Sequence, residues 1–521
     1  MNKEQIIVTA AQMREIEERI FAAGMPVAAL MEKVAGLISQ RIQKLFPTKQ
    51  RVGILVGPGH NGGDALVVGR ELHWRGYEVW IYAPFSKYKE LTAQHLQYVK
   101  SLDISCYENI EDLPSCDFLI DGLFGFGLER EITEPIAAAI SYFNASNTPI
   151  ISIDLPSGIH TDTGAILGTA IQATYTLCLG LWKQGLLQEN ALDYIGKAEL
   201  IDFDIPLAYI YAVLGESPPV KRITTATALT SLPLPRPLIT HKYKQGHLLL
   251  ICGSRRYAGG AIITGLGARA SGVGMLSIAV PESIKPLLVS HLPEALIIGC
   301  PETETGAIAD LELPDNTDLH SFSAIACGPG LTKDTTAIVQ QVLASKSPLV
   351  LDADGLNVLA QLGTIPTLQK RQAVTVLTPH TGEFHRLFPE ISYTDRVQAV
   401  QTAAAQSGAV VLLKGARIAI ANPQGIVWIN PESTSALARG GSGDVLTGLL
   451  GGLIAQSENK FAIEDIVATA SWWHSQAGIL AAQERTELGV DAFTLTQYLI
   501  PALSRGRKKK TEVTEVAGVT E

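Results

Sequence analysis

The sequence predicts an α/β protein built from two doubly wound domains. In both halves of the chain, short apolar runs alternate with longer segments of helical periodicity, a pattern typical of parallel βαβ units. A stretch rich in proline, from Pro218 to Pro237, has weak periodicity and indicates a connection between domains. With 521 residues the chain is also too long for one ordinary core. We therefore expect domains at 1–220 and 221–505, followed by a disordered tail at 506–521.

The first domain should open with two helices within residues 9–44. Apolar and β-branched runs then predict strands at 51–56, 78–83, 118–120 and 149–153. Amphipathic segments between these runs predict helices at 65–75, 91–101 and 134–143.

The second domain repeats this alternation. A helix of small residues should follow 258–261, and strands are predicted at 247–252, 275–280, 324–327, 349–352, 374–377 and 410–413. The segments 417–421 and 426–429, joined by Asn-Pro-Gln-Gly, predict a β-hairpin. The last predicted helices are 444–456 and 466–483; we interpret Trp472, Trp473 and His474, which lie in the second, as packing residues.

Composition narrows the class of protein. A formal net charge of -10 argues against nucleic acid as a main partner, despite a short basic run at 507–510. The six cysteines include no CxxC pair, which favours reduced thiols and a cytoplasmic location. The polar N-terminus is not typical of a signal peptide, and no uninterrupted apolar stretch reaches the length of about 18 residues that a membrane span needs.

Three loops carrying aspartate and glycine follow predicted strands of the first half, at 57–64, 121–128 and 154–158. Each alone is explained as an ordinary turn, but the carboxyl ends of parallel strands converge on one crevice. Glycine-rich backbone beside a helix start suits a pyrophosphate or nucleotide. Asn61, Asp121 and Ser157 offer hard oxygens suited to an alkali or alkaline-earth cation. Asp154 could transfer a proton if burial tunes its pKa.

In the second half, residues 438–448 combine a glycine turn, the single acid Asp444 and an apolar run of helical character. Backbone N–H groups at such a helix start can hold a phosphate, and the carboxylate can deprotonate a hydroxyl during phosphoryl transfer. The alternative is a tight turn with Asp as helix N-cap. Nearby, Lys414 could contact phosphate or be a solvated surface lysine, and His380 could be a satisfied loop histidine. Glu383 and Asp354 could act through Mg²⁺ or water.

With these motifs assembled, the chain resembles the family of bifunctional nicotinamide-nucleotide repair enzymes over about residues 5–500. That family joins NAD(P)H-hydrate epimerase to ADP/ATP-dependent NAD(P)H-hydrate dehydratase. The resemblance implies an N-terminal Rossmann-like domain of the YjeF type and a C-terminal ribokinase-like domain. The epimerase loop of the family usually reads Asn-Asn-Gly-Gly-Asp-Gly, and this chain departs from it at His60 and Ala65.

The resemblance also implies site residues. The epimerase half would contact the hydrated nucleotide through His60, Asn61, Gly62, Gly63, Asp64, Gly125, Phe126, Gly127, Leu128, Glu129, Arg130, Glu131 and the catalytic Asp154, and would hold K⁺ through Asn61, Asp121 and Ser157. The dehydratase half would contact the hydrate through Ala261, Gly330, His380, Thr381, Gly382, Glu383, Phe384, His385, Arg386 and Asp444. The adenine nucleotide would lie against Lys414, Gly415, Ala416, Arg417, Ile418, Thr434, Arg439, Gly440, Gly441, Ser442 and Gly443.

The implied substrates are the hydrates NADHX and NADPHX, with ADP as co-substrate, ATP as the alternative, and Mg²⁺ in the dehydratase half. The epimerase half would interconvert the R and S hydrates. Asp444 would act as base while the hydrate hydroxyl attacks ADP, and AMP and phosphate would be released as NAD(P)H is restored. Two rivals remain at this point: a ribokinase-like small-molecule kinase, and an active dehydratase with a non-catalytic N-terminal binding module. We expect no nucleic-acid or membrane partner, and a homo-oligomer is left open.

Overall fold

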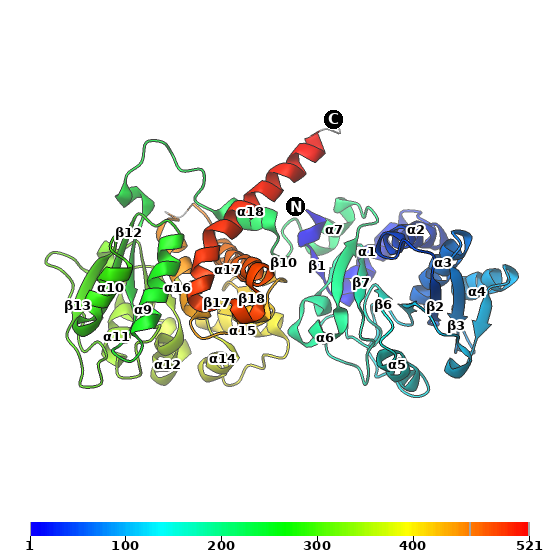
Figure 1. Cartoon of the computed structure of the whole chain (residues 1–521), viewed down its shortest axis with the longest axis horizontal. Coiled ribbons are helices and arrows are strands. Elements are labelled where there is room, and N and C mark those ends of the chain that lie inside the picture. Colours follow the sequence, from blue (N-terminus) through cyan, green and yellow to red (C-terminus); the bar gives the residue numbers. More distant parts are fainter. Residues whose placement is uncertain (1, 458–459, 519–521) are drawn as a thin grey trace. The chain divides into compact units, whose positions relative to one another are not determined.

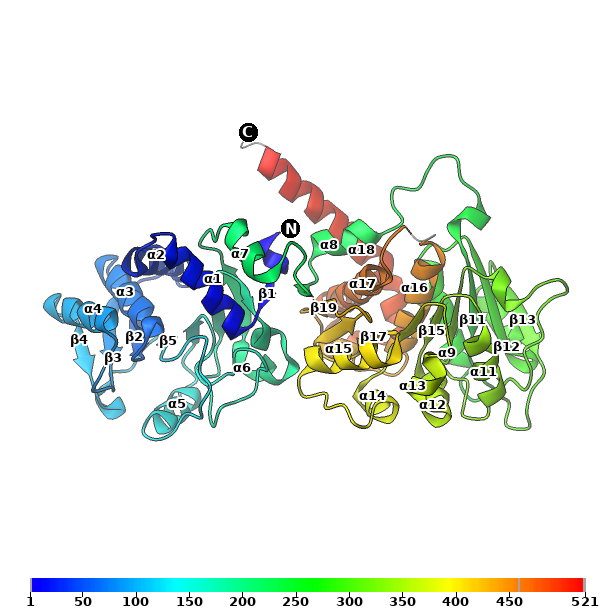
Figure 2. The same ribbon diagram turned by 180° about the vertical axis from the view of Figure 1, so that it is seen from behind.

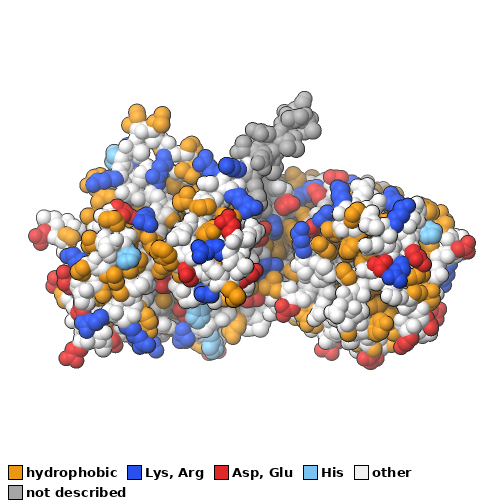
Figure 3. Space-filling model, viewed as in Figure 1, with side chains coloured by type: hydrophobic (Ala, Val, Ile, Leu, Met, Phe, Trp, Pro, Cys, Tyr) orange, Lys and Arg blue, Asp and Glu red, His pale blue; other side chains and the backbone are white. Residues whose placement is uncertain are grey.

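The computed structural model describes residues 2–457 and 460–518. The chain divides into two compact units, residues 1–220 and 221–521, and each contains its own sheet (Figures 1 and 2). On the face shown in Figure 3, acidic and basic side chains are interspersed over both units rather than gathered by sign. The predicted α/β class is confirmed in both units.

The sheet of the first unit is parallel, with the strand order β4-β3-β2-β5-β6-β7-β9. Its strands are β2 (Arg51–Val56), β3 (Glu78–Tyr82), β4 (Ser105–Tyr107), β5 (Phe118–Gly122), β6 (Ile150–Ile153), β7 (Tyr175–Leu179) and β9 (Lys197–Ile201). The short strands β1 (Ile7–Val8) and β8 (Trp182–Lys183) pair in parallel as a separate ribbon. The sequence predicted β2 with its observed bounds, but it did not predict β7 or β9.

Apolar cores lie on both faces of this sheet, because successive strand residues point to opposite sides. Ile54 belongs to the core under the first helices, whereas its neighbour Leu55 packs with Ile140 and Phe143 on the other face. The helices are α1 (Ala10–Ala22), α2 (Val27–Leu45), α3 (His60–Trp74), α4 (Glu90–Ser101), α5 (Ile136–Ala145), α6 (Leu192–Ile195) and α7 (Leu207–Leu214).

The sheet of the second unit has the order β10-β19-β18-β17-β16-β15-β14-β11-β12-β13. Its strands are β10 (Val220–Arg222), β11 (His247–Ile251), β12 (Met275–Pro281), β13 (Leu296–Cys300), β14 (Ala324–Cys327), β15 (Leu349–Leu351), β16 (Thr375–Leu377), β17 (Val410–Leu413), β18 (Ile418–Ala421) and β19 (Val427–Asn430). From β13 to β17 neighbouring strands are parallel, while β17, β18 and β19 pair antiparallel. The predicted hairpin is therefore confirmed as β18–β19.

Two glycine-rich helices of the second unit pack backbone to backbone. These are α9 (Ala258–Ala270) and α16 (Ser442–Ala455). A Cβ on Gly448 would lie 1.9 Å from the Thr264 carbonyl oxygen, and one on Gly267 would lie 2.3 Å from the Val445 carbonyl oxygen. The other helices are α8 (Thr225–Ala228), α10 (Lys285–His291), α11 (Thr336–Ala344), α12 (Ala353–Leu362), α13 (Thr364–Leu368), α14 (Thr381–Leu387), α15 (Arg396–Ser407), α17 (Ile463–Arg485) and α18 (Ala492–Gly518).

The C-terminal segment differs from the disordered tail that the sequence predicted at 506–521. Helix α18 continues through Gly518, and residues 519–521 lie outside the described part of the chain. No glycine or proline interrupts residues 507–517, where lysine and glutamate favour helix. As for membrane spans, no single described helix is long and apolar enough to cross a bilayer; only α1 and α2 together, bent by 119°, pass by length and composition.

Two candidate active sites

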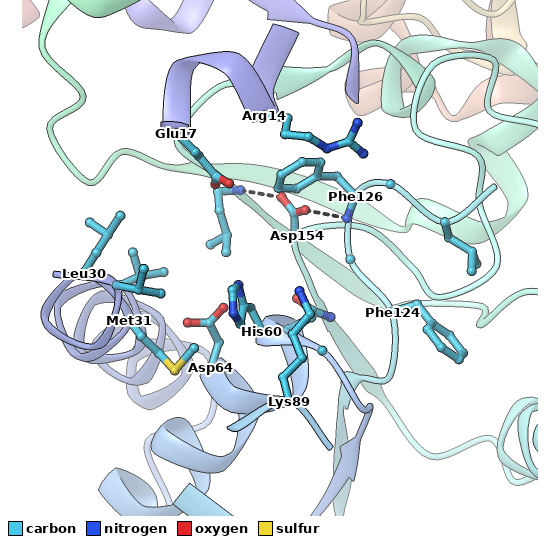
Figure 4. Close-up of a pocket in the computed structure, with 18 of the residues that line it drawn as sticks. Arg14, Glu17, Leu30, Met31, His60, Asp64, Lys89, Phe124, Phe126 and Asp154 are labelled. Atoms are coloured by element: carbon cyan, nitrogen blue, oxygen red, sulfur yellow. Dashed lines mark hydrogen bonds between the residues drawn. The ribbon is translucent and has the colours of Figure 1, made fainter. Parts of the chain in front are cut away.

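The first candidate site is a cavity of about 870 Å³ in the first unit (Figure 4). It lies where the loops after β2, β5 and β6 meet, the carboxyl edge at which parallel sheets bind ligands. Of the residues predicted for this half, the lining contains His60, Asn61, Asp64, Gly125, Phe126, Gly127, Leu128, Glu129, Arg130 and Asp154. The structure thus brings the three predicted loops together at one cavity.

The glycine loop is shorter than the sequence predicted, because α3 begins at His60 rather than near residue 65. Gly62 and Gly63 are buried in the first turn of this helix and do not line the cavity, nor does Glu131. A Cβ on Gly62 would lie 2.0 Å from the Gly57 carbonyl oxygen, so close packing requires glycine there. The N–H groups of this first turn have no partners within the helix, which suits an anionic group of a ligand.

Asp154 forms a buried ion pair with Lys183, a residue that sequence reasoning missed. The distance from Lys183 Nζ to Asp154 Oδ1 is 2.5 Å, and the two side chains are 1% and 4% exposed. Asp154 Oδ2 accepts a hydrogen bond of 3.0 Å from the Phe126 N–H, and Asp154 itself has a φ of 70°. The carboxylate is therefore held in one orientation at the cavity wall, as Figure 4 shows.

Two further carboxyl groups line the cavity near this pair: Glu17 from α1 lies beside it, and Asp64 from α3 faces it from the side of His60 (Figure 4). Burial raises the pKa of Glu17 to about 7, although Lys183 opposes this shift. Burial, with the charges of Asp154 and Glu17, raises the pKa of Asp64 well above its usual range. Groups that hold protons near neutral pH thus lie beside a fixed carboxylate, which is an arrangement suited to proton transfer.

Of the predicted cation ligands, Asp121 and Ser157 do not line the cavity and are buried behind it. Asp121 accepts hydrogen bonds from the Ser157 hydroxyl (2.6 Å) and backbone N–H (2.9 Å) and from the Ser152 hydroxyl (2.8 Å). The third predicted ligand, Asn61, lines the cavity beside Gly125, where a Cβ on that glycine would be 3.0 Å from the Asn61 Oδ1. Among the described residues, no cationic side chain pairs with the fully buried Asp121 carboxylate. Burial raises the pKa of Asp121, although hydrogen bonds from Ser157 and Ser152 oppose the shift, and the hard oxygens gathered here suit an alkali or alkaline-earth cation.

The second candidate site is a cavity of about 710 Å³ at the N-terminus of α16. It is lined by Arg256, Tyr257, Gly259, Gly260, Ile263, Gly330, Thr332, Lys333, Asp354, Gly440, Gly441, Asp444 and Ala492. Gly441, with a φ of 89°, is the N-cap residue of this helix and no side chain caps it, so the alternative of Asp444 as N-cap is wrong.

Asp444 lies in the first turn of α16 and faces this cavity. Burial and the nearby Asp352 raise its pKa to about 6, although Lys414 opposes the shift. A carboxyl group with this pKa is mostly ionised at neutral pH and is a stronger base than an ordinary aspartate. Behind it, the buried His474 of α17 donates from Nε2 to the Ser442 carbonyl oxygen at 2.9 Å, which anchors the first turn. Trp472 and Trp473 are buried too, as the packing interpretation predicted.

Lys414 is not the solvated surface lysine that the sequence left open. Its Nζ lies 2.7 Å from Asp352 Oδ1 and 3.9 Å from Glu383 Oε2. A Cβ on Gly443 would lie 3.3 Å from the same Nζ, so the ammonium group is beside the start of α16. Burial opposes its charge, but Asp352 and Glu383 raise its pKa. A fixed positive charge next to free helix N–H groups is an arrangement suited to phosphate.

The remaining predicted residues of this half are spread over neighbouring elements. His380 caps α14, with Nδ1 accepting from the Gly382 N–H at 3.0 Å, and its side chain is 54% exposed. Ala261 is buried in α9, while the Arg417 and Arg439 guanidinium groups donate to the Pro431 and Leu488 carbonyl oxygens. Predicted residues that do not line the second cavity are Ala261, His380, Thr381, Gly382, Glu383, Phe384, His385, Arg386, Lys414, Gly415, Ala416, Arg417, Ile418, Thr434, Arg439, Ser442 and Gly443.

No group of three or more His, Cys, Asp or Glu in the described part of the chain is arranged to hold a metal ion. The carboxylates near Asp444 are already engaged: Asp352 with Lys414 and Thr447, and Asp354 with the Thr332 N–H. Resident Mg²⁺ held by three side chains therefore does not fit this site. A magnesium ion would instead arrive on the phosphates of a nucleotide, with few protein ligands.

Sequence reasoning missed Glu17, Arg14 and Lys183 in the first site and Arg256 and Lys333 in the second. A weak signal existed for two of them. Lys183 is the lone charged residue in the apolar run 177–187. Glu17 follows the buried Ile16 and precedes the buried Ile20 on α1, so an acid lies close to a core-facing stripe.

Comparison with known proteins gives matches over both units. Residues 27–185 match the family described as YjeF-related protein N-terminus, and residues 248–501 match the family described as NAD(P)H-hydrate dehydratase. A Synechocystis protein named bifunctional NAD(P)H-hydrate repair enzyme Nnr is 57% identical over 95% of this chain and 94% of its own length. A Thermosynechococcus vestitus protein of the same name is 52% identical over 96% and 97%. A solved Bacillus subtilis ADP/ATP-dependent NAD(P)H-hydrate dehydratase is 33% identical over 54% of this chain and 97% of its own, with a TM-score of 0.47.

Proposed function

Because the chain belongs to the family of bifunctional NAD(P)H-hydrate repair enzymes, we propose that its two cavities perform the two steps of that repair. The first unit is the epimerase and the second is the dehydratase. The observation that supports this assignment most directly is the pair of separate acid-containing cavities, one in each unit, at Asp154 and Asp444. A small-molecule kinase would not account for the first of them.

In the epimerase cavity, Asp154 acts on the proton of the hydroxyl-bearing ring. Lys183 and the Phe126 N–H hold its carboxylate in place, and the neighbouring Glu17 can accept or return a proton near neutral pH. The first turn of α3 and the loop 125–130 bind the nucleotide. Asn61, Asp121 and Ser157 hold K⁺, which when bound supplies the positive charge that the buried Asp121 lacks.

Dehydration requires the hydroxyl group of the hydrate to leave the ring, and hydroxide is a poor leaving group. Asp444 takes the proton of the hydrate hydroxyl as its oxygen attacks the terminal phosphorus of ADP, and AMP leaves. Phosphate then departs from the ring carbon together with a ring proton, which restores the double bond of NAD(P)H. Lys414 and the N–H groups of Gly440, Gly441 and Gly443 hold the transferring phosphoryl group, with Mg²⁺ carried on the nucleotide.

The test is recovery of dihydronicotinamide absorbance from purified R and S hydrates of NADH, with Mg²⁺ and K⁺ present and with ADP, ATP or neither added. Complete recovery that requires a nucleotide is expected, with AMP and phosphate as products when ADP is used. Recovery that stops at the S fraction would leave the dehydratase but refute the epimerase assignment. A phosphorylated product that accumulates would refute dehydration and favour a kinase.

The K⁺ site has an independent test. Replacing K⁺ by choline should slow epimerisation and also lower the melting temperature of the protein, because the buried Asp121 would lose its counter-ion. The matched variant Asp121→Asn should abolish the K⁺ dependence of the melting temperature. A melting temperature that is equal in K⁺ and choline would exclude a specific ion at this place.

A further inference from the structure

A smaller cavity of about 400 Å³ adjoins the dehydratase cavity and has no role in the chemistry described above. It is lined by Lys333, Asn357, Ala360, Gln361 and Arg386. Lys333 lines both cavities, so the smaller one continues from the larger along this side chain. The chain supplies its walls from the loop after β14, from α12 and from α14.

Both cations of this cavity are free of acidic partners. Among the described residues, no carboxylate lies within ion-pair distance of Lys333 or Arg386. Asp354, an acid that lines the larger cavity, accepts from the Thr332 N–H (2.9 Å) and from Asn357 Nδ2 (3.3 Å). Asp334, next to Lys333 in the chain, accepts from the Thr305 hydroxyl. The positive charge of the cavity is therefore not neutralised by its own walls.

Arg386 lines the cavity with one guanidinium nitrogen engaged. Its Nε donates to Asn357 Oδ1 at 3.0 Å, while Asn357 donates to Asp354. The terminal nitrogens have no acidic partner among the described residues, Nη1 lies 3.8 Å from a Cβ built on Gly382, and a planar pair of donors of this kind matches two oxygens of a phosphate. The amide of Gln361 on α12 offers a further polar group at the same wall.

We infer that this cavity binds the 2′-phosphate on the adenosine ribose of NADPHX, and that Lys333 and Arg386 favour the NADPH hydrate over the NADH hydrate. The inference rests on the proposed dehydratase function. The hydroxyl group of the hydrated ring must lie at Asp444, and ADP must occupy the start of α16. The adenosine end of the hydrate therefore has to extend out of the larger cavity in a direction that ADP does not occupy. The route past Lys333 leads to a site with two unpaired cations.

The first experiment needs no turnover. Binding of NADP⁺ and of NAD⁺ to the full-length protein would be compared by calorimetry, in the wild type and in the variants Lys333→Gln and Arg386→Gln. We expect the wild type to bind NADP⁺ more tightly, and each variant to reduce that advantage about tenfold, the effect of one hydrogen-bonded charge. Lys370→Gln, which removes an exposed lysine of the same unit outside both cavities, should change neither affinity.

The second experiment measures kcat/KM for the S hydrates of NADPH and NADH with saturating ADP. The ratio of the two values should fall about tenfold in each variant and be unchanged in Lys370→Gln. Equal losses for both hydrates, or for both dinucleotides in calorimetry, would mean that the cations hold the shared pyrophosphate, and would overturn the inference. Turnover of neither hydrate by the wild type would refute the proposed function, whereas a wild type that binds NADP⁺ no better than NAD⁺ refutes the inference alone.

Discussion

Replacing Asp444 by asparagine should abolish dehydration and at the same time stabilise the second unit. The carboxylate acts as a base, and a positioned base contributes about 10²–10⁴-fold to the rate. We therefore expect kcat for dehydration to fall by about 10³-fold, while epimerisation, which takes place in the other unit, keeps its rate.

The stabilisation follows from the raised pKa. In the folded protein the Asp444 pKa is about 6, against 3.8 for an ordinary aspartate. A raised pKa means that the folded state holds the proton more tightly, so this carboxyl group lowers stability as the pH rises from about 4 to 6 and the ionised form prevails. Two pKa units correspond to about 3 kcal/mol, an upper limit for a group that solvent partly reaches. Asparagine has nearly the same shape and carries no charge.

The assay combines two measurements on the same protein. Thermal unfolding of Asp444→Asn at pH 8 should show the second unit melting about 5 °C higher than in the wild type, and the difference should vanish below pH 4. Turnover of the S hydrate with ADP gives the loss of activity. Asp465→Asn changes an acid whose pKa is also raised by burial but which bonds Trp428, and it should leave turnover unchanged. Normal turnover in Asp444→Asn would refute its role as base, and an unchanged melting temperature at pH 8 would refute the desolvation argument.

Three further outcomes are expected. Lys183→Met leaves Asp154 buried without its partner, so it should lower the stability of the first unit by about 3–5 kcal/mol and stop epimerisation. The control Lys197→Met, at an exposed ion pair, should change stability by less than about 1 kcal/mol, and equal effects of the two variants in thermal unfolding would contradict the buried pair. Gly448→Ala should lower the free energy of unfolding by about 1–3 kcal/mol, since its Cβ would meet backbone, whereas Gly36→Ala, in open space on α2, should raise it by about 1 kcal/mol. Dehydratase kcat/KM should fall about tenfold per pH unit below pH 6, as Asp444 becomes protonated; a flat profile down to pH 5 would exclude it as the titrating base.

The strands that could be predicted from the sequence are those whose whole length is apolar and bounded by turn residues. β2 and β14 have the predicted bounds because glycine or serine follows or precedes a continuous buried run. β13 (Leu-Ile-Ile-Gly-Cys) was missed although it is apolar, because it is short and lies between Pro293 and Pro301, and its pairing with β12 is what makes it a strand. The residue pattern of a short segment does not reveal which distant strand it pairs with.

The site residues that could be predicted are likewise those that lie in a recognisable local motif. Asp154 begins and Asp444 ends a short glycine-containing motif, so each could be found in its own segment. Lys183 and Glu17 could not, because they become part of a site only when α1 and β8 fold against the loop after β6. The start of α3 was also misplaced, since glycine usually argues against a helix interior, whereas here close backbone contact requires Gly62.

The backbone contact between α9 and α16 restricts which substitutions this unit can accept. Asp444 lies on a helix whose glycines leave no room for a methyl group against α9. Substitutions at Gly267 or Gly448 would displace the helix that carries the base, although neither residue lines a cavity. Substitutions that lower catalytic activity are therefore expected at packing glycines as well as at residues that contact the substrate. A saturation-mutagenesis map of this unit should show that side chains larger than glycine at these two positions lower activity.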